Sequence, residues 1–478
     1  MKQSRSSQVP AIRWHRSRLV WPWLLAIAML VTTAGVAQAA NLNGKRVAVK
    51  GTTAAGPAKY DRLWVRKYGP SDPSCVLVLS PGSPAGQGGF ARIGPELTQR
   101  VKGLTVWAID RRPNAFEDTS VFKRDQPRKS LGYYLLGQRV GGGLFKPVQG
   151  SDAGFVRQWG AATALGDLRN VIQKANDVSS CVMIGGHSFG TLLSEAYVAW
   201  DFNGTPGYQG LDGIVLVDGG LFGAFKDVLD PAGYPAFQSV AEARARIAKL
   251  KRQSPFGSDG SIAGLPAWVP GVTPEIVCQY ATKHPNAVSG LQKSTIGTHF
   301  IPGLPSVSVT NEAFAGLFFR ATAGDEGARL GRLSNRGDPL RWRNGRYASV
   351  SRFCSTFTQE PGNGLEWYFP QRLMVEVTQA LEPLKRNAIT DSLGLRPFHL
   401  AEVDLPLYVL QTKLSDGGVL RAAHKFIRES KITDYTLVDD PGADHTDPLV
   451  DYPKHNRFLK TVVPFLKDTI HDAQAGTP

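Results

Sequence analysis

Residues 182–191 read VMIGGHSFGT, an apolar run that breaks into glycines around a single serine, Ser188. Glycine inside a strand or helix costs about 0.5–1 kcal/mol relative to alanine, so Gly185, Gly186 and Gly190 need a structural reason. At a sharp strand-to-helix turn, side chains two residues on either side of the turn would clash. The spacing G-x-S-x-G between an apolar run and a helix-like segment is typical of a nucleophile elbow, which lifts the serine hydroxyl above a sheet. The N-terminus of the helix that follows would favour negative charge on a substrate oxygen.

From residue 46 onward, short apolar and β-branched runs alternate with helix-like segments. This alternation predicts a largely parallel sheet that is covered by helices. The expected strands are residues 46–49, 63–68, 76–80, 105–109, 182–185, 213–217, 407–411 and 435–438. The expected helices are residues 90–101, 158–175, 191–200, 419–429 and 454–466. A long connection, residues 111–155, follows the fourth strand, and connections of that length tend to be functional or disordered.

The motif GHSFG, placed between an apolar strand and a helix, resembles the nucleophile elbow of the α/β-hydrolase superfamily. The resemblance covers two blocks, residues 40–220 and 401–478, which an inserted cap at residues 221–400 separates. It implies an α/β fold with an eight-stranded, mostly parallel sheet, helices on both faces and the inserted cap. It also implies a catalytic triad of serine, acid and histidine, in that order along the chain.

A serine hydroxyl needs a base that can cycle protons near neutral pH, and histidine is the side chain suited to this. His445 lies in DDPGADHTDP, a turn rich in Gly, Pro and Asp after the last expected strand, where the superfamily places its base. The other histidines lie in the N-terminal segment, the cap, or helical and tail segments, except His187. His187 lies inside the elbow, where we expect its ring to point away from the Ser188 hydroxyl. We therefore predict that Ser188 is the nucleophile and His445 the base.

The acid of the triad has two candidates. Asp416 follows the seventh expected strand, which is the superfamily's commonest position for the acid, and Asp218 follows the sixth, a position that some relatives use. We favour Asp416 and keep Asp218 as the alternative. Asp444 adjoins His445, but successive side chains point apart, so we interpret it as surface charge.

An acyl-transfer site also needs backbone N–H groups that stabilise an oxyanion. Phe189, directly after the nucleophile, offers one of them. The other is expected from the loop after the third strand, LSPGSPAGQGGF, in which proline cannot donate. Ser83 is the preferred donor and Gly82 the second choice.

Four cysteines allow three disulfide connectivities, and the spacing does not choose among them. The sheet order of the superfamily puts the third and fifth strands side by side. That order implies that Cys75 and Cys181, which immediately precede those strands, form one bridge. Cys278 and Cys354, both in the cap, would then form the other.

The N-terminal residues predict a targeting segment. Five basic residues precede the apolar run LVWPWLLAIAMLVTTAGVA, which ends in Ala37-Gln38-Ala39, a cleavage pattern of small residues. We expect a signal peptide cleaved after Ala39, a secreted or periplasmic protein, and no stable membrane span once the peptide is removed. The formal charge of the chain is +15, but nucleic acid is an improbable partner for an exported protein.

Residues 329–352 hold seven arginines and a single acid, Asp338, which fits either attraction of an anionic or polymeric substrate or a solvated basic surface. The sequence contains no metal-ligand spacing of the HExxH kind and no dinucleotide fingerprint, so we expect neither a metal nor a cofactor.

The leading hypothesis is a secreted serine hydrolase that cleaves carboxylic esters, small or polymeric, through an acyl-enzyme. One alternative is a serine aminopeptidase similar to the proline iminopeptidase and tripeptidyl aminopeptidase group, with Glu366, Glu376 and Glu382 available in the cap to hold a substrate ammonium. The other is a non-catalytic binding protein on a hydrolase scaffold.

Overall fold

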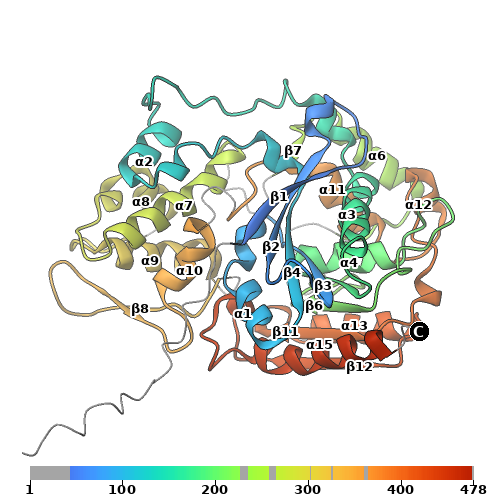
Figure 1. Cartoon of the computed structure of the whole chain (residues 1–478). Coiled ribbons are helices and arrows are strands. Elements are labelled where there is room, and N and C mark those ends of the chain that lie inside the picture. The colour runs from blue at the N-terminus through green and yellow to red at the C-terminus, as the bar shows by residue number, and fades with distance from the viewer. Residues whose placement is uncertain are drawn as a thin grey trace, which may run out of the picture. The chain divides into compact units, whose positions relative to one another are not determined.

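The eight strands that the sequence predicts form one sheet in the order β1-β2-β4-β3-β5-β6-β11-β12 (Figure 1). Strand β2 alone runs against the others, because it pairs antiparallel with both β1 and β4 while every other pairing is parallel. The strands are β1 (Lys45–Lys50), β2 (Arg62–Tyr68), β3 (Cys75–Ser80), β4 (Leu104–Asp110), β5 (Val182–His187), β6 (Gly213–Val217), β11 (Leu407–Thr412) and β12 (Tyr435–Asp440).

This computed structural model describes residues 44–226, 235–257, 265–301, 303–324, 327–359 and 364–475. The expected signal peptide, residues 1–39, lies outside the described residues. No helix within the described ranges has the length and apolar character needed to cross a membrane.

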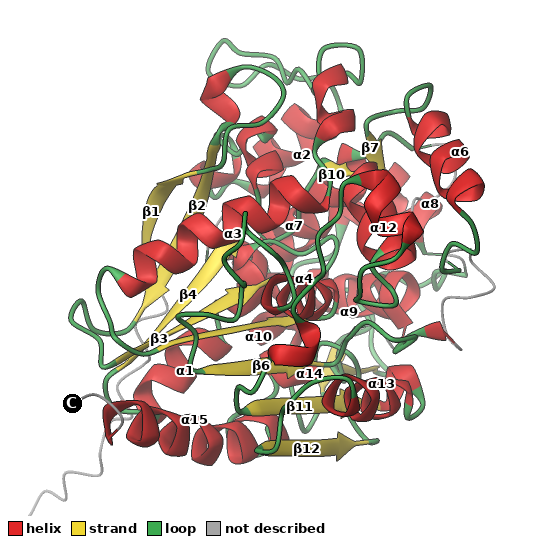
Figure 2. Cartoon of the chain, turned by 90° about the vertical axis from the view of Figure 1, so that its right-hand side faces the viewer, coloured by secondary structure: helices red, strands yellow, loops and turns green. Residues whose placement is uncertain are grey.

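Helices cover both faces of the sheet (Figure 2). The central strands β3, β5 and β6 are buried along their whole length, which explains why they read as continuous apolar runs rather than alternating ones. One face packs against α1 (Ile93–Arg100) and α15 (Arg457–Ala475), and the other against α3 (Ala161–Asn176), α4 (Phe189–Val198) and α13 (Gly418–Arg428). In α13 the buried positions Val419, Ala422, Ala423 and Phe426 follow the helical repeat that produces one apolar stripe.

The interval between β6 and β11 contains two groups of elements (Figure 1). Helices α7 to α10 join the hydrophobic cluster on the α1 and α15 face, whereas α6 and α11 join the cluster on the α3 and α4 face. The elements are α6 (Val240–Leu250), β7 (Phe256–Gly257), α7 (Trp268–Lys283), α8 (Thr295–Phe300), α9 (Asn311–Ala323), β8 (Gly331–Leu333), β9 (Trp342–Asn344), α10 (Val350–Thr358), β10 (Phe369–Pro370), α11 (Gln371–Val375), a π-helical turn (Glu376–Ala380) and α12 (Ala388–Leu393).

The connection at residues 111–155 is more ordered than the sequence suggests. It contains α2 (Pro127–Leu135), which begins with a proline, a residue whose fixed φ suits the first helical position. This helix contacts α7, so the connection joins the cap on that face of the sheet.

Both expected disulfides are confirmed. Cys75 and Cys181 join the starts of the neighbouring parallel strands β3 and β5, and their Cα atoms are 4.6 Å apart. Cys278 of α7 is bonded to Cys354 of α10, with a Cα separation of 5.0 Å. Each bridge thus reinforces contacts that the packing already makes.

The bridge between Cys278 and Cys354 closes a sequence separation of 76 residues. Replacing both cysteines by alanine should lower the free energy of unfolding by about 4 kcal/mol, because a long loop loses much entropy when it is closed. Guanidinium unfolding of the double variant, compared with the oxidised protein, measures the loss. Equal stabilities would show that this bridge does not constrain the unfolded chain.

Candidate active site

Ser188 lies at the sharp turn between β5 and α4. Its backbone has φ 53° and ψ −123°, a region that residues with a side chain seldom occupy. The glycines permit this turn: a Cβ at Gly186 would lie 2.3 Å from the carbonyl carbon of Gly190, and a Cβ at Gly190 would lie 2.0 Å from the carbonyl oxygen of Ser80. The Ser188 side chain remains half-buried, while its flanking residues His187 and Phe189 are buried. The elbow therefore has the geometry that the sequence motif predicts.

His445 is hydrogen-bonded to Asp218. The His445 Nδ1 atom lies 2.5 Å from Asp218 Oδ2, and the two side chains are 9% and 0% exposed. Asp218 also accepts bonds from the Thr412 N–H, at 2.7 Å, and from the Thr412 hydroxyl. Burial alone would raise the pKa of Asp218. The hydrogen bond and charge of His445 and the two hydrogen bonds from Thr412 lower it by more, so the pKa of Asp218 lies below its usual value. Asp218 is thus an ionised partner for the imidazole.

The favoured acid, Asp416, is not brought to His445. It is exposed and has a left-handed backbone, φ 45°, at the end of a short 3-10 turn after β11. The residue that ends β11 is Thr412, and its N–H and hydroxyl point to the Asp218 carboxylate instead. The alternative acid therefore occupies the position that we expected for Asp416, because the loop after β11 carries its carboxylate outward.

His187 is a neighbour of the base that sequence reasoning missed. We expected its ring to point away from the Ser188 hydroxyl. The ring lies against the His445 ring with centroids 4.4 Å apart, and its Nε2 is 2.9 Å from the His445 carbonyl oxygen. Burial, reinforced by the nearby His445, lowers the pKa of His187 to about 3. A neutral imidazole can donate one hydrogen bond, so His187 fixes the main chain of His445 without adding charge.

Two of the expected oxyanion donors, Phe189 and Gly82, lie next to Ser188. Phe189 is the first residue of α4, so its N–H has no acceptor inside the helix. Gly82 lies in the loop after β3, where a Cβ would come within 2.9 Å of Ser188 Cβ and 3.3 Å of His187 Nδ1. Ser83 follows it and is partly exposed. The loop therefore passes directly beside the candidate nucleophile.

Arg111, which follows β4, holds this loop in place. Its guanidinium donates to the carbonyl oxygens of Pro81, Gly82 and Ala85 at 2.7, 2.8 and 3.0 Å. The same guanidinium forms an ion pair with Glu366 of the cap, 2.7 Å from Nη2 to Oε2, in which both residues are buried. The cap backbone adds two bonds, from the Glu366 N–H to the Pro84 carbonyl and from the Gly86 N–H to the Gly364 carbonyl. The sequence near Arg111 or Glu366 does not predict this ion pair, because the two residues are 255 positions apart in the chain.

The loop after Asp218 is held by two carboxyl groups, those of the buried Glu195 and the half-buried Glu382. Glu195 of α4 accepts a bond from the Leu221 N–H, and Glu382 accepts from the N–H groups of Phe222 and Gly223. A little further along the loop, the ring of Phe225 meets the His445 ring edge-on at 6.0 Å. Burial raises the pKa of Glu195 to about 8 and that of Glu382 to about 7.

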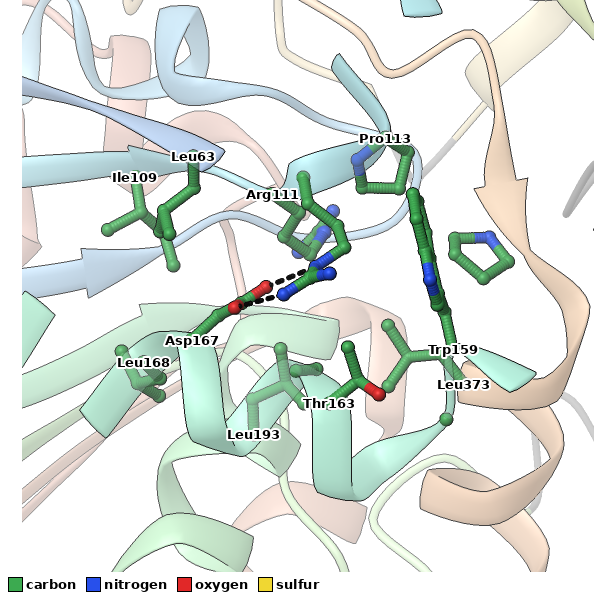
Figure 3. Close-up of a pocket in the computed structure, with 14 residues that line it drawn as sticks. Leu63, Ile109, Arg111, Pro113, Trp159, Thr163, Asp167, Leu168, Leu193 and Leu373 are labelled. Carbon is green, nitrogen blue, oxygen red and sulfur yellow. Dashed lines mark hydrogen bonds and ion pairs between the residues drawn. The ribbon is translucent and has the colours of Figure 1, made fainter. Parts of the chain in front are cut away.

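A small cavity lies beside Arg111 on the α3 side of the sheet (Figure 3). Its volume is about 30 Å³, and Arg112 crosses it to form an ion pair with Asp167. Such a volume holds one or two waters, so this cavity is too small to receive a substrate. Its labelled lining includes Leu63, Ile109, Pro113, Trp159, Thr163, Leu168, Leu193 and Leu373.

Among solved structures, this chain is similar to a candidate lipase from Sulfolobus solfataricus at 13% identity and a TM-score of 0.50, with 87% of this chain and 92% of that chain covered. The chain has the α/β-hydrolase fold. Two further α/β-hydrolase structures match with TM-scores of 0.38 and 0.37: a candidate epoxide hydrolase from Klebsiella pneumoniae (14% identity, 90% and 99% covered) and a thermophilic esterase from Thermogutta terrifontis (13% identity, 89% and 99% covered). No family model and no curated protein matches the sequence.

Breaking the ion pair of Arg111 and Glu366 should lower the free energy of unfolding substantially. Glu366→Gln removes the charge but keeps the shape, and it should cost about 3–5 kcal/mol because it leaves a buried guanidinium without a counterion. Glu429→Gln, which removes a surface pair with Lys425 at 4.0 Å, is the control and should cost less than about 1 kcal/mol. Guanidinium unfolding measures the free energy of unfolding of both variants. Equal losses would show that the buried ion pair stabilises the fold no more than the surface pair does.

Glu195 should make stability depend on pH. A folded-state pKa raised to about 8 means that the folded chain binds this proton more tightly than the unfolded chain, whose carboxyl has a pKa near 4.5. The resulting stabilisation is complete below about pH 4.5 and is lost as the pH rises towards 8, by up to about 1.4 kcal/mol per pH unit.

Glu195→Gln can still accept the Leu221 bond, and it should remove the contribution of Glu195 to the slope, while the raised pKa values of Glu382 and Asp451 keep theirs. Urea unfolding of both proteins between pH 4.5 and 8 tests the expectation. Stability curves that run parallel would contradict a protonated Glu195.

Proposed function

We propose that this chain is an exported serine hydrolase that cleaves carboxylic esters through an acyl-enzyme. Ser188 is the nucleophile, His445 the general base and Asp218 the acid that orients the base. The observation that carries the proposal is the short bond between His445 Nδ1 and the ionised Asp218, and the strained elbow at Ser188 supports it. That bond leaves Nε2 of the same imidazole as the nitrogen for the Ser188 proton.

In the first half of the reaction, Ser188 Oγ attacks the ester carbonyl carbon while its proton passes to His445 Nε2. The negative charge then rests on the former carbonyl oxygen, where the N–H groups of Phe189 and of Gly82 or Ser83 stabilise it. Collapse of this intermediate breaks the ester C–O bond, and the alcohol leaves with the proton held by His445. Water repeats the sequence on the acyl-enzyme and releases the carboxylic acid and free Ser188.

Esters are favoured over aminopeptidase substrates because the cap carboxylates are already occupied. Glu366 is bound by Arg111, and Glu376 by Arg372 and by the Ala161 N–H. Glu382 is bound by backbone N–H groups after Asp218. A subsite for a substrate ammonium needs a carboxylate that is free to face it. Serine at the elbow also favours acyl transfer over the epoxide chemistry named for some neighbours, since it attacks a carbonyl carbon.

Export fits the two disulfides, since such bonds persist in oxidising compartments. The substrate is a small or polymeric ester, and the proposed chemistry requires no metal or cofactor. The hypothesis of a non-catalytic binding protein is less favoured, because the positions of nucleophile, base and acid all hold side chains that can perform these roles.

The assay is hydrolysis of p-nitrophenyl esters of increasing acyl length and of aminoacyl p-nitroanilides, together with labelling of Ser188 by a fluorophosphonate. We expect ester turnover and labelling that Ser188→Ala abolishes. Turnover of the anilides alone would replace this proposal by the aminopeptidase. No turnover and no labelling would favour the binding protein.

The acid is tested by a matched pair of variants. Asp218→Asn should lower kcat about 10³- to 10⁴-fold, because the amide cannot balance the imidazolium and favours the wrong tautomer. Asp416→Asn should leave kcat within twofold, since Asp416 is exposed and does not contact His445. A large loss in Asp416→Asn with little change in Asp218→Asn would reverse the assignment.

A further inference from the structure

The seven arginines of residues 329–352 divide into two kinds. Five of them are exposed and surround the small β8–β9 ribbon, in which Arg332 and Arg343 stand directly opposite each other. The other two, Arg329 and Arg352, turn into the protein and bind the core. The stretch is therefore not only a solvated basic surface.

Arg329 binds the turn that carries His445. Its main-chain N–H donates to Asp447 Oδ1 at 2.9 Å, and its Nε pairs with Asp447 Oδ2. Its two terminal nitrogens donate to the Gly442 carbonyl oxygen at 2.5 Å and to Asp451 Oδ2 at 2.9 Å. The guanidinium also stacks over the Tyr347 ring at 3.6 Å. One cap residue thus contacts the turn on both sides of the base.

These contacts converge on the backbone next to His445. Asp447 Oδ2 accepts the Asp444 N–H at 2.7 Å, directly before the base. Directly after it, the N–H and the hydroxyl of Thr446 donate to the carbonyl oxygen of Gly327, two residues from Arg329. The cap segment that includes Gly327 and Arg329 therefore fixes both neighbours of His445 in the chain.

Arg329 is the cation that faces two buried acidic side chains of this turn. The side chains of Asp447 and Asp451 are 0% and 4% exposed, and both bind the same guanidinium. Burial and the Asp447 charge raise the pKa of Asp451 to about 8, against the opposing effect of Arg329. Two buried carboxylates side by side repel each other unless a cation or a proton separates them. A pKa near 8 leaves Asp451 largely protonated at neutral pH, so a proton and Arg329 hold the pair together. Removing the guanidinium would take away the side-chain bonds that join Asp447, Asp451 and the Gly442 carbonyl oxygen to the cap.

We propose that Arg329 is a positioning residue for the base: through Asp447 and Asp451 it holds the turn at residues 442–451, and with it His445, in register with Ser188. The cap then contributes to the positioning of the proposed base. This inference rests on the proposed hydrolase function. Arg329 touches neither substrate nor the reacting atoms, so its effect passes entirely through the turn.

The test compares Arg329→Ala and Arg329→Lys with two control arginines. Arg343→Ala removes an exposed charge from the same stretch, and Arg372→Ala breaks a cap ion pair with the buried Glu376. With a soluble p-nitrophenyl ester, Arg329→Ala should lower kcat at least tenfold while KM stays within twofold. Arg329→Lys should recover part of kcat, because lysine restores the charge but not the forked geometry. Both controls should keep kcat within twofold.

A second readout does not depend on turnover. The proton shared by His445 and Asp218 should give a downfield imidazole N–H resonance in the NMR spectrum of the wild-type protein, identified by its absence in Asp218→Asn. Arg329→Ala should shift or broaden this resonance, and Arg372→Ala should leave it unchanged. If Arg329→Ala does not fold, Arg329→Lys should show the same effects at smaller size.

The outcomes separate the two proposals. An unchanged kcat and resonance in the Arg329 variants would overturn the positioning role, as would equal losses in Arg329→Ala and Arg372→Ala. A wild-type protein that hydrolyses nothing, with a resonance that still responds to Arg329, would refute the hydrolase while supporting the coupling between the cap and His445.

Discussion

The crowded turn at Ser188 is the constraint around which the rest of the site is arranged. The turn fits only because Gly186 and Gly190 have no side chains to meet neighbouring backbone. Its position in the sheet then determines which loops can reach it. Strands β3 and β6 flank β5, so the loop after β3 and the acid after β6 arrive at the same edge as the serine. The parallel arrangement of these strands gathers the chemistry at their carboxyl ends.

The cap contributes to the geometry on two sides of this edge. Glu366 binds Arg111, which holds the carbonyl oxygens of the loop beside the oxyanion position. Arg329 binds the turn of the base. Both contacts are largely buried ion pairs that cross from the insertion to the core. Because losing one partner of such a pair leaves an uncompensated charge, the two parts of the chain are strongly coupled at these points.

The acidic side chains near the site differ in the direction in which their surroundings shift their pKa values. Asp218 is surrounded by donors that stabilise its negative charge, which suits a group that must balance an imidazolium. Glu195 and Glu382 instead hold backbone N–H groups where burial favours the protonated acid. Asp218 is therefore kept ionised next to His445, while Glu195 and Glu382 hold the loop between Asp218 and Phe225.

The sequence by itself determined the features that depend on local pattern. Buried strands were readable as continuous apolar runs, and the sharp turn as glycines around Ser188. The histidine in the turn after the last strand, which we propose as the base, was also visible in the sequence. Only the tertiary structure showed that Asp218 and not Asp416 contacts the His445 imidazole, because the path of a loop determines which carboxylate reaches it. It also placed His187, Arg329 and Glu366, whose partners lie 258, 118 and 255 residues away. Contacts across such separations leave no periodic trace in the chain, since they form only when distant segments pack together.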